Sequence, residues 1–158
     1  MRFQKKNPQR EIPADPQQAA LRLLKQREHS QAQLRSKLKM RGCLPEEVDQ
    51  ALSKLRDGGL QSDARFAELL IRSRSNQGYG PVRLRAELSV AGVPRELVEQ
   101  ALADCDINWL QSAEQWVMRK FGGPPAAAEG HDRCYRLLQQ RGYPAEVILA
   151  VLGRRPSV

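Results

Sequence analysis

One phrase of about fifteen residues occurs three times in this chain, and this repetition constrains the fold more than any other feature. It reads "LKMRGCLPEEVDQAL" at 38–52, "LSVAGVPRELVEQAL" at 88–102 and "LQQRGYPAEVILAVL" at 138–152. The glycines of the three copies, Gly42, Gly92 and Gly142, follow one another at a constant interval of 50 residues. A period of this length is typical of arrays of small helical units.

Each copy of the phrase predicts two helices joined by a tight turn. A leucine lies four residues before each glycine, and apolar residues at such intervals share one face of a helix. Glycine suits the left-handed conformation that ends a helix, because it has no Cβ. The proline that soon follows suits the first turn of the next helix. These prolines are Pro45, Pro94 and Pro144.

A third amphipathic helix precedes each pair. Ser30 and Gln33 are spaced as a capping box, and Asp63 and Ser112 are placed as N-caps of their helices. No segment alternates like a strand. The side chains that we expect to face inward on the first helices are Ala20, Leu23 and Leu24, then Phe66, Leu69 and Leu70, then Ala113, Trp116 and Val117.

The predicted fold is all-α, an elongated and curved array of three tandem three-helix repeats. Glycine-rich and acidic stretches separate the units. The expected boundaries are a basic flexible tail at 1–14, repeats at 15–57, 58–106 and 107–153, and a C-terminal tail at 154–158.

The charge of the chain favours a polyanionic partner. Lysines and arginines number 26 against 18 acidic residues, which gives a formal net charge of +8. No apolar run approaches the roughly 20 residues that span a bilayer, and the N-terminus lacks a secretion signal. We therefore expect a cytoplasmic protein. The three cysteines, Cys43, Cys105 and Cys134, form no metal-binding pattern and are interpreted as small buried hydrophobes.

No catalytic constellation is visible in the sequence. His29 and His131 are isolated and are interpreted as solvated histidines. The stretch "GYGP" lacks the Gly-Lys-Ser/Thr ending of a phosphate loop. We expect no enzymatic activity, no cofactor and no metal.

The basic residues around the second unit are the strongest candidates for binding. The window 73–86 contains arginines and a tyrosine but no aspartate or glutamate. Such a segment can contact phosphates or an acidic protein groove. The predicted contact residues are Arg72, Arg74, Tyr79, Arg83 and Arg85, with Lys37 and Arg41 as support.

Residues 17–153 resemble the RecX family, the regulators of RecA recombinase. The resemblance rests on "REHSQAQLRSKLKMRG", "GGLQSDARFAELLIRSR", "GYGPVRLRAELSVAGV" and "LLQQRGY". Ser62 stands where the family often has an asparagine, and the third unit is the least regular.

The resemblance implies three tandem three-helix repeats that lie, as a monomer, in the groove of the RecA–DNA filament and span adjacent protomers. It also implies inhibition of strand exchange, ATP hydrolysis and coprotease activity, and hence a role in recombination, repair and the SOS response. Only weak, salt-sensitive contact with DNA itself is expected.

The alternative is a protein that binds DNA directly through helix-turn-helix-like units. A recognition helix presents polar residues to base edges, whereas the helices after the glycines begin with acids, as in "PEEVDQ" and "PREL". Sequence-dependent affinity for DNA in the absence of RecA would distinguish this alternative from the filament regulator.

Overall fold

The computed structural model describes residues 15–157, and this part of the chain contains nine α-helices and no strand. The all-α prediction is therefore confirmed, while the predicted tail at 1–14 lies outside the described residues. The helices are α1 (Pro16–Gln26), α2 (Gln31–Met40), α3 (Pro45–Asp57), α4 (Asp63–Asn76), α5 (Pro81–Val90), α6 (Arg95–Asp104), α7 (Trp109–Phe121), α8 (Ala128–Gln140) and α9 (Ala145–Leu152).

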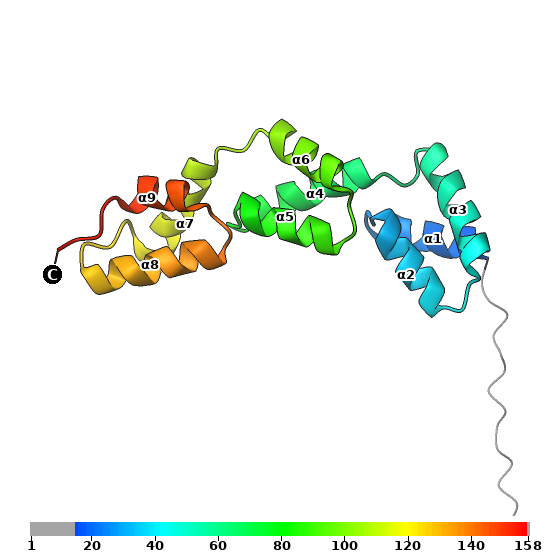
Figure 1. Cartoon of the computed structure of the whole chain (residues 1–158), viewed down its shortest axis with the longest axis horizontal. Helices are drawn as coiled ribbons and strands as arrows, with labels where there is room; N and C mark the ends of the chain where they lie inside the picture. The colour runs from blue at the N-terminus through cyan, green and yellow to red at the C-terminus, as the bar shows by residue number, and fades with distance from the viewer. Residues whose placement is uncertain (1–14, 158) are drawn as a thin grey trace, which may run out of the picture. The chain divides into compact units, whose positions relative to one another are not determined.

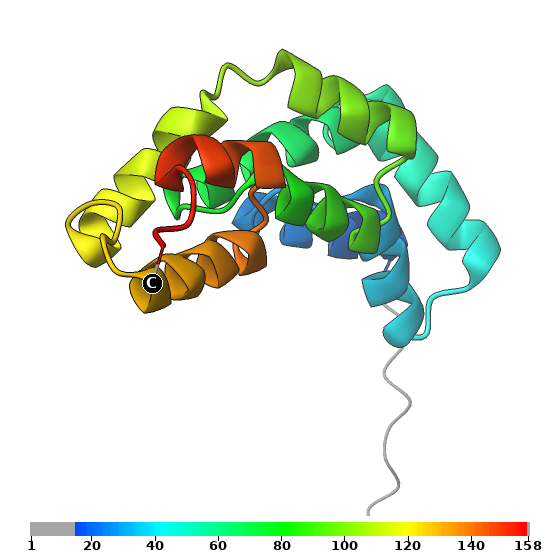
Figure 2. The ribbon, with the colours of Figure 1, turned by 60° about the vertical axis from the view of Figure 1, so that its left-hand side comes forward.

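The helices pack in threes (Figure 1). In repeat 1, α1, α2 and α3 contact one another; in repeat 2, α4, α5 and α6 do the same; in repeat 3, α9 packs on both α7 and α8 (Figure 2). The chain divides into two compact units, of which unit 1 (Met1–Ser62) holds repeat 1 and unit 2 (Asp63–Val158) holds repeats 2 and 3.

The repeated phrase forms the same structure each time. Gly42, Gly92 and Gly142 all have positive φ, between 76° and 89°, as the left-handed turn requires. Leu38, Leu88 and Leu138 before them are fully buried. The sequence therefore predicted the turn and the core position correctly in all three repeats.

Each repeat has its own hydrophobic core. The core of repeat 1 is built around Leu34, Leu38 and Leu52. Trp109, at the start of α7, packs against the cores of both repeat 2 and repeat 3. Unit 2 is thus held together by a shared aromatic side chain as well as by the loop contacts described below.

Two local predictions are wrong. Leu69 is 41% exposed, because the buried side of α4 runs through Phe66, Ala67 and Ile71. Ser112 does not cap α7, because the helix begins a turn earlier and Asn108 accepts a hydrogen bond from the N–H of Gln111 at 3.0 Å. The Ser112 hydroxyl instead pairs with the Tyr143 hydroxyl at 2.8 Å.

The capping box at Ser30 and two of the three thiols agree with the sequence, whereas Asp63 is the first residue of α4 and its expected role as an N-cap stays a prediction. Ser30 and Gln33 form the expected capping box at the start of α2, and Pro81 occupies the first turn of α5. Cys43 and Cys134 are buried, as expected of small apolar residues, whereas Cys105 is half-buried. Burial raises the pKa of the Cys134 thiol, which keeps this group in its unreactive neutral form.

Candidate functional site

Three of the predicted contact residues surround the loop between α4 and α5. Arg74 lies in the last turn of α4, Tyr79 in the loop, and Arg83 in the first turn of α5. The loop turns sharply at Gly78, whose φ is +82°. The next helix then begins directly at Pro81, whose fixed φ suits a first helical turn. A glycine turn and a proline start thus bring the three side chains together.

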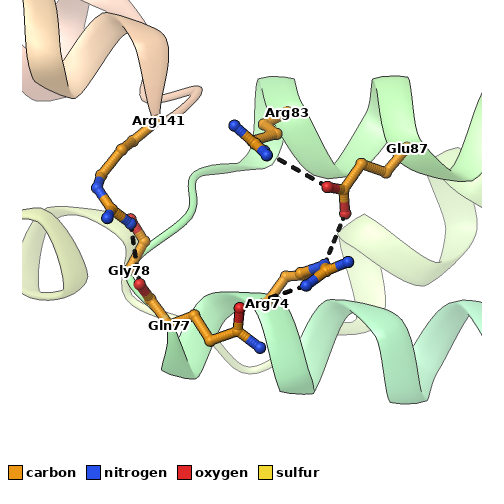
Figure 3. Close-up of polar contacts among 6 residues, drawn as sticks. All are labelled: Arg74, Gln77, Gly78, Arg83, Glu87 and Arg141. Atoms are coloured by element: carbon orange, nitrogen blue, oxygen red, sulfur yellow. Dashed lines mark hydrogen bonds and ion pairs between the residues drawn. The ribbon is translucent and has the colours of Figure 1, made fainter.

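Glu87 of α5 pairs with two of the arginines (Figure 3). Its carboxylate accepts a hydrogen bond from Nε of Arg74 at 3.0 Å and lies 3.4 Å from Nε of Arg83. Arg74 also donates to the side-chain oxygen of Gln77 at 3.3 Å. The guanidinium groups are therefore oriented by the protein itself.

The two remaining arginines among the predicted contact residues, Arg72 and Arg85, also have acidic partners. Arg72 pairs with Glu68 at 2.8 Å, one turn earlier on α4, and Arg85 pairs with Glu99 of α6 at 2.8 Å. The hydrogen bond from Arg85 lowers the pKa of Glu99 below its usual value. The window 73–86 therefore lacks acids in the sequence but not in space, because Glu87 pairs with Arg74 and Arg83 and Glu99 pairs with Arg85.

These pairs leave the arginines available to a stronger partner. Each pair lies on the surface, with arginine side chains 41–65% exposed. Exposed ion pairs contribute only about 0–1 kcal/mol, so a phosphate or a carboxylate of a partner can compete for the guanidinium groups.

Tyr79 is already engaged within the chain. The guanidinium carbon of Arg83 lies 4.2 Å from the centroid of the tyrosine ring, and that of Arg141 lies 4.6 Å from it. The ring also packs against the core of repeat 2. Tyr79 therefore acts first as a structural contact between repeats 2 and 3.

Arg141, at the end of α8, is the residue of this site that the sequence analysis missed. Its Nη1 donates to the carbonyl oxygens of Gln77 at 3.0 Å and Gly78 at 3.3 Å (Figure 3), and its guanidinium also lies 4.9 Å from the ring centroid of Trp116. The only signal in the sequence was that Arg141 precedes a repeat glycine, as Arg41 does.

The backbone completes the contact between the two repeats. The N–H of Gly80 donates to the carbonyl oxygen of Arg141 at 2.8 Å, and the N–H of Val82 donates to that of Gly142 at 2.9 Å. A Cβ added to Gly80 would lie 2.5 Å from the carbonyl oxygen of Gly142. Both glycines are buried, so this approach requires glycine on each side.

Lys37 and Arg41 lie on unit 1, at the end of α2. Both side chains are exposed, and neither makes an ion pair with any residue of 15–157 for which a side chain is described. They differ in this respect from the arginines of repeat 2.

Both histidines are buried, so the interpretation as solvated residues is wrong. His29 is 1% exposed, and its Nδ1 lies 2.9 Å from the carbonyl oxygen of Arg27. Burial lowers the pKa of His29. His131 is 4% exposed, with Nε2 at 3.3 Å from the carbonyl oxygen of Gly153. His29 lies in the loop between α1 and α2, and His131 lies on α8 against the chain that follows α9.

The described residues hold no group of three or more metal-ligating side chains. Within the same residues, no helix is long and apolar enough to cross a bilayer.

Comparison with known families gives two matches along the chain. Residues 18–55 match the model of the first three-helix domain of RecX, and residues 62–102 match that of the second three-helix domain. These ranges cover repeat 1 and repeat 2.

Curated relatives match over nearly the whole length. The regulatory protein RecX of Pseudomonas savastanoi pv. phaseolicola is 40% identical over 146 residues, which are 92% of this chain and 94% of the relative. The regulatory protein RecX of Acidithiobacillus ferrooxidans is 43% identical over 141 residues, or 89% and 90% of the two chains.

Solved structures share the fold. The crystal structure of RecX from Lactobacillus salivarius superposes with a TM-score of 0.73 at 18% identity, covering 86% of this chain and 91% of that one. A second crystal structure of a regulatory protein RecX gives a TM-score of 0.71 at 22% identity, covering 88% and 72%. Together with the family models and with relatives that match over about nine-tenths of their length, these likenesses show that the chain belongs to the RecX family.

Proposed function

We propose that this chain is a non-enzymatic regulator that binds in the groove of the RecA–DNA filament as a monomer in the cytoplasm. Bound there, it inhibits strand exchange, ATP hydrolysis and coprotease activity, and so acts in recombination, repair and the SOS response. The observation that carries the proposal is the 40% identity to a regulatory protein RecX over more than nine-tenths of both chains.

The surface chemistry supports this role. A filament groove presents DNA phosphates and protein side chains together, and the +8 charge draws the chain toward them. We propose Arg72, Arg74, Arg83 and Arg85, with Tyr79, Lys37 and Arg41, as the residues that contact the filament. Several modest contacts on linked repeats raise the total affinity through effective concentration.

The direct test is the ATPase activity of RecA on single-stranded DNA, measured while the purified chain is titrated in. We expect progressive inhibition, and the same titration should suppress strand exchange. Full ATPase activity at every ratio, with a sample that is helical by circular dichroism, would refute the proposal.

Direct DNA binding is the second candidate, because glycine turns between helices resemble helix-turn-helix units. The charge of the helix starts disfavours this candidate. The first turns of α3, α6 and α9, where a recognition helix would approach phosphates, carry acidic residues, namely Glu46, Glu47, Glu96 and Glu146. Fluorescence anisotropy with duplex DNA in the absence of RecA should show only weak binding that salt abolishes. Sequence-dependent nanomolar affinity would favour this candidate instead.

A further inference from the structure

The turn after α8 shows how a glycine turn of this chain binds a loop. The turn offers one guanidinium group, that of Arg141, and two carbonyl oxygens, those of Arg141 and Gly142. The loop offers an aromatic ring, that of Tyr79, and two backbone N–H groups, those of Gly80 and Val82. The guanidinium stacks on the ring and also donates to the carbonyl oxygens of Gln77 and Gly78, while the two N–H groups of the loop donate to the two carbonyl oxygens of the turn.

Repeat 1 contains a second copy of this turn, at Arg41 and Gly42. Arg41 has φ −85° and ψ 4°, against −76° and −7° for Arg141, and Gly42 has φ +82°, against +89° for Gly142. In both copies the N–H after the glycine returns to the leucine carbonyl, at 3.2 Å from Cys43 to Leu38 in repeat 1 and at 3.1 Å in repeat 3. The two turns therefore share their backbone geometry, and each carries an arginine followed by a glycine at matching positions.

Repeat 2 lacks this combination. Its turn has Ala91 in place of the arginine, and Ala91 is buried. Of the three repeat turns, those of repeats 1 and 3 carry the cation.

The space beside Gly42 in repeat 1 is open, whereas the space beside Gly142 in repeat 3 is filled. A Cβ added to Gly42 would have nothing within 4 Å, whereas one added to Gly142 would collide with the backbone of Arg83. Two apolar side chains flank the open turn, Met40 at 87% exposure and Leu44 at 62%. These two side chains can supply apolar contact area beside the polar groups of the turn.

The chemistry of the turn favours a protein loop over a DNA phosphate. Carbonyl oxygens accept hydrogen bonds and so repel phosphate oxygens, which also only accept. Glu46 and Glu47 follow in the first turn of α3 and add negative charge nearby. The loop 77–82 of this chain is already bonded to Arg141 and Gly142, so the matching loop for repeat 1 is sought in the partner.

We propose that the turn Met40–Leu44 binds a loop of the recombinase that carries an aromatic residue beside a glycine. The aromatic ring stacks on the guanidinium of Arg41, and backbone N–H groups of the loop donate to the carbonyls of Arg41 and Gly42. Met40 and Leu44 cover the apolar edge of the contact. The inference rests on the proposed function for the identity of the partner.

The first test locates the occupant. A photoreactive benzoylphenylalanine replaces Met40, which keeps Arg41 intact, and the full chain is irradiated on RecA–single-stranded DNA filaments. Mass spectrometry should map the crosslink to a recombinase peptide with an aromatic residue next to a glycine. The same probe at Lys54, an exposed residue of α3, should not reach that peptide. Crosslinks to DNA, to a second copy of this chain or to a peptide without an aromatic residue would overturn the proposal.

The second test measures the contribution of the guanidinium. Arg41→Ala should weaken inhibition of the recombinase about tenfold, the scale expected when one stacked cation is lost. Arg41→Lys should weaken it nearly as much, because an ammonium group cannot reproduce the planar stack. Lys54→Ala removes the same charge and should leave inhibition unchanged.

The outcomes separate this inference from the proposed function. No inhibition by the unaltered chain would refute the proposed function. Inhibition by the unaltered chain that Arg41→Ala does not weaken would refute only the role of the turn. Full rescue by Arg41→Lys, with an effect that disappears at high salt, would show a simple phosphate contact and would also overturn the inference.

Discussion

Replacement of Gly142 by alanine tests how far repeats 2 and 3 depend on one close approach. The matched control is Gly42→Ala, because both glycines have φ near +85° and alanine is strained in that region by about 1–2 kcal/mol. Only Gly142 is crowded: three atoms of Arg83, two of them backbone, lie within 3 Å of the added Cβ. The difference between the variants therefore measures the contact and not the turn.

The additional loss of stability in Gly142→Ala follows from the contacts that break when Arg83 moves away from residue 142. Moving Arg83 away from Gly142 breaks the hydrogen bonds Gly80–Arg141 and Val82–Gly142, each worth about 1 kcal/mol. It also disrupts the stacking of Arg141 on Tyr79, worth about 0.5–1 kcal/mol. We expect Gly142→Ala to cost on the order of 3 kcal/mol more than Gly42→Ala.

Urea unfolding measures this difference with two probes. Both tryptophans, Trp109 and Trp116, lie on α7, so tryptophan fluorescence reports unit 2, while circular dichroism at 222 nm reports all helices. The fluorescence transition gives the loss of stability of unit 2 in Gly142→Ala, and the circular dichroism transition gives the loss in Gly42→Ala. We expect the loss in Gly142→Ala to be the larger by on the order of 3 kcal/mol. Equal losses of stability in the two variants would refute the reasoning.

Three further predictions use other contacts. Arg141→Ala should lower the urea midpoint of tryptophan fluorescence, because Arg141 bonds the carbonyls of the loop 77–82. Arg136→Ala, which changes an exposed arginine of α8, should lower the midpoint less. Equal midpoints for the two variants would show that Arg141 does not stabilise unit 2 through the loop. Burial lowers the pKa of His29, so between that value and about 6.5 the unfolded chain binds more protons. The free energy of unfolding should thus fall as pH drops from 7.5 to 5.5, and His29→Gln should flatten the dependence measured by circular dichroism; an unchanged slope would contradict it. A variant in which the four paired arginines are changed to alanine should inhibit RecA more weakly and with less dependence on salt, without loss of helicity; these arginines are Arg72, Arg74, Arg83 and Arg85. A second variant, in which their acidic partners are changed to glutamine, should inhibit more strongly; these partners are Glu68, Glu87 and Glu99. Stronger inhibition by the first variant than by the second would show that the contact surface lies elsewhere.

The fold followed from the sequence because its signals are local. A glycine after a leucine-spaced helix, and a proline after the glycine, act within one turn of chain, so periodicity located the helices and the cores around Leu38, Leu88 and Leu138. Leu69 shows the limit, since two leucines in succession leave the buried side of a helix undecided until its neighbours are known.

The candidate site could be predicted only in part because its pairings are long-range. The partners Arg85 and Glu99 lie 14 residues apart, and Arg141 and Gln77 lie 64 residues apart. A local sequence pattern does not predict pairs at such separations. His131 was misjudged for the same reason, since its ring nitrogen pairs with the carbonyl oxygen of Gly153, 22 residues later. The sequence thus predicted which residues carry the charge, while the structure determined which of them are paired.

The shared packing of Trp109 has a practical consequence for dissection of the molecule. A fragment that ends before α7 would strip the core of repeat 2 of this indole and leave the ring of Tyr79 without Arg141, so we expect it to expose apolar surface and aggregate. A cut between Ser62 and Asp63 severs neither contact. Anyone who wishes to express halves of this protein should divide it there and treat the last six helices as indivisible.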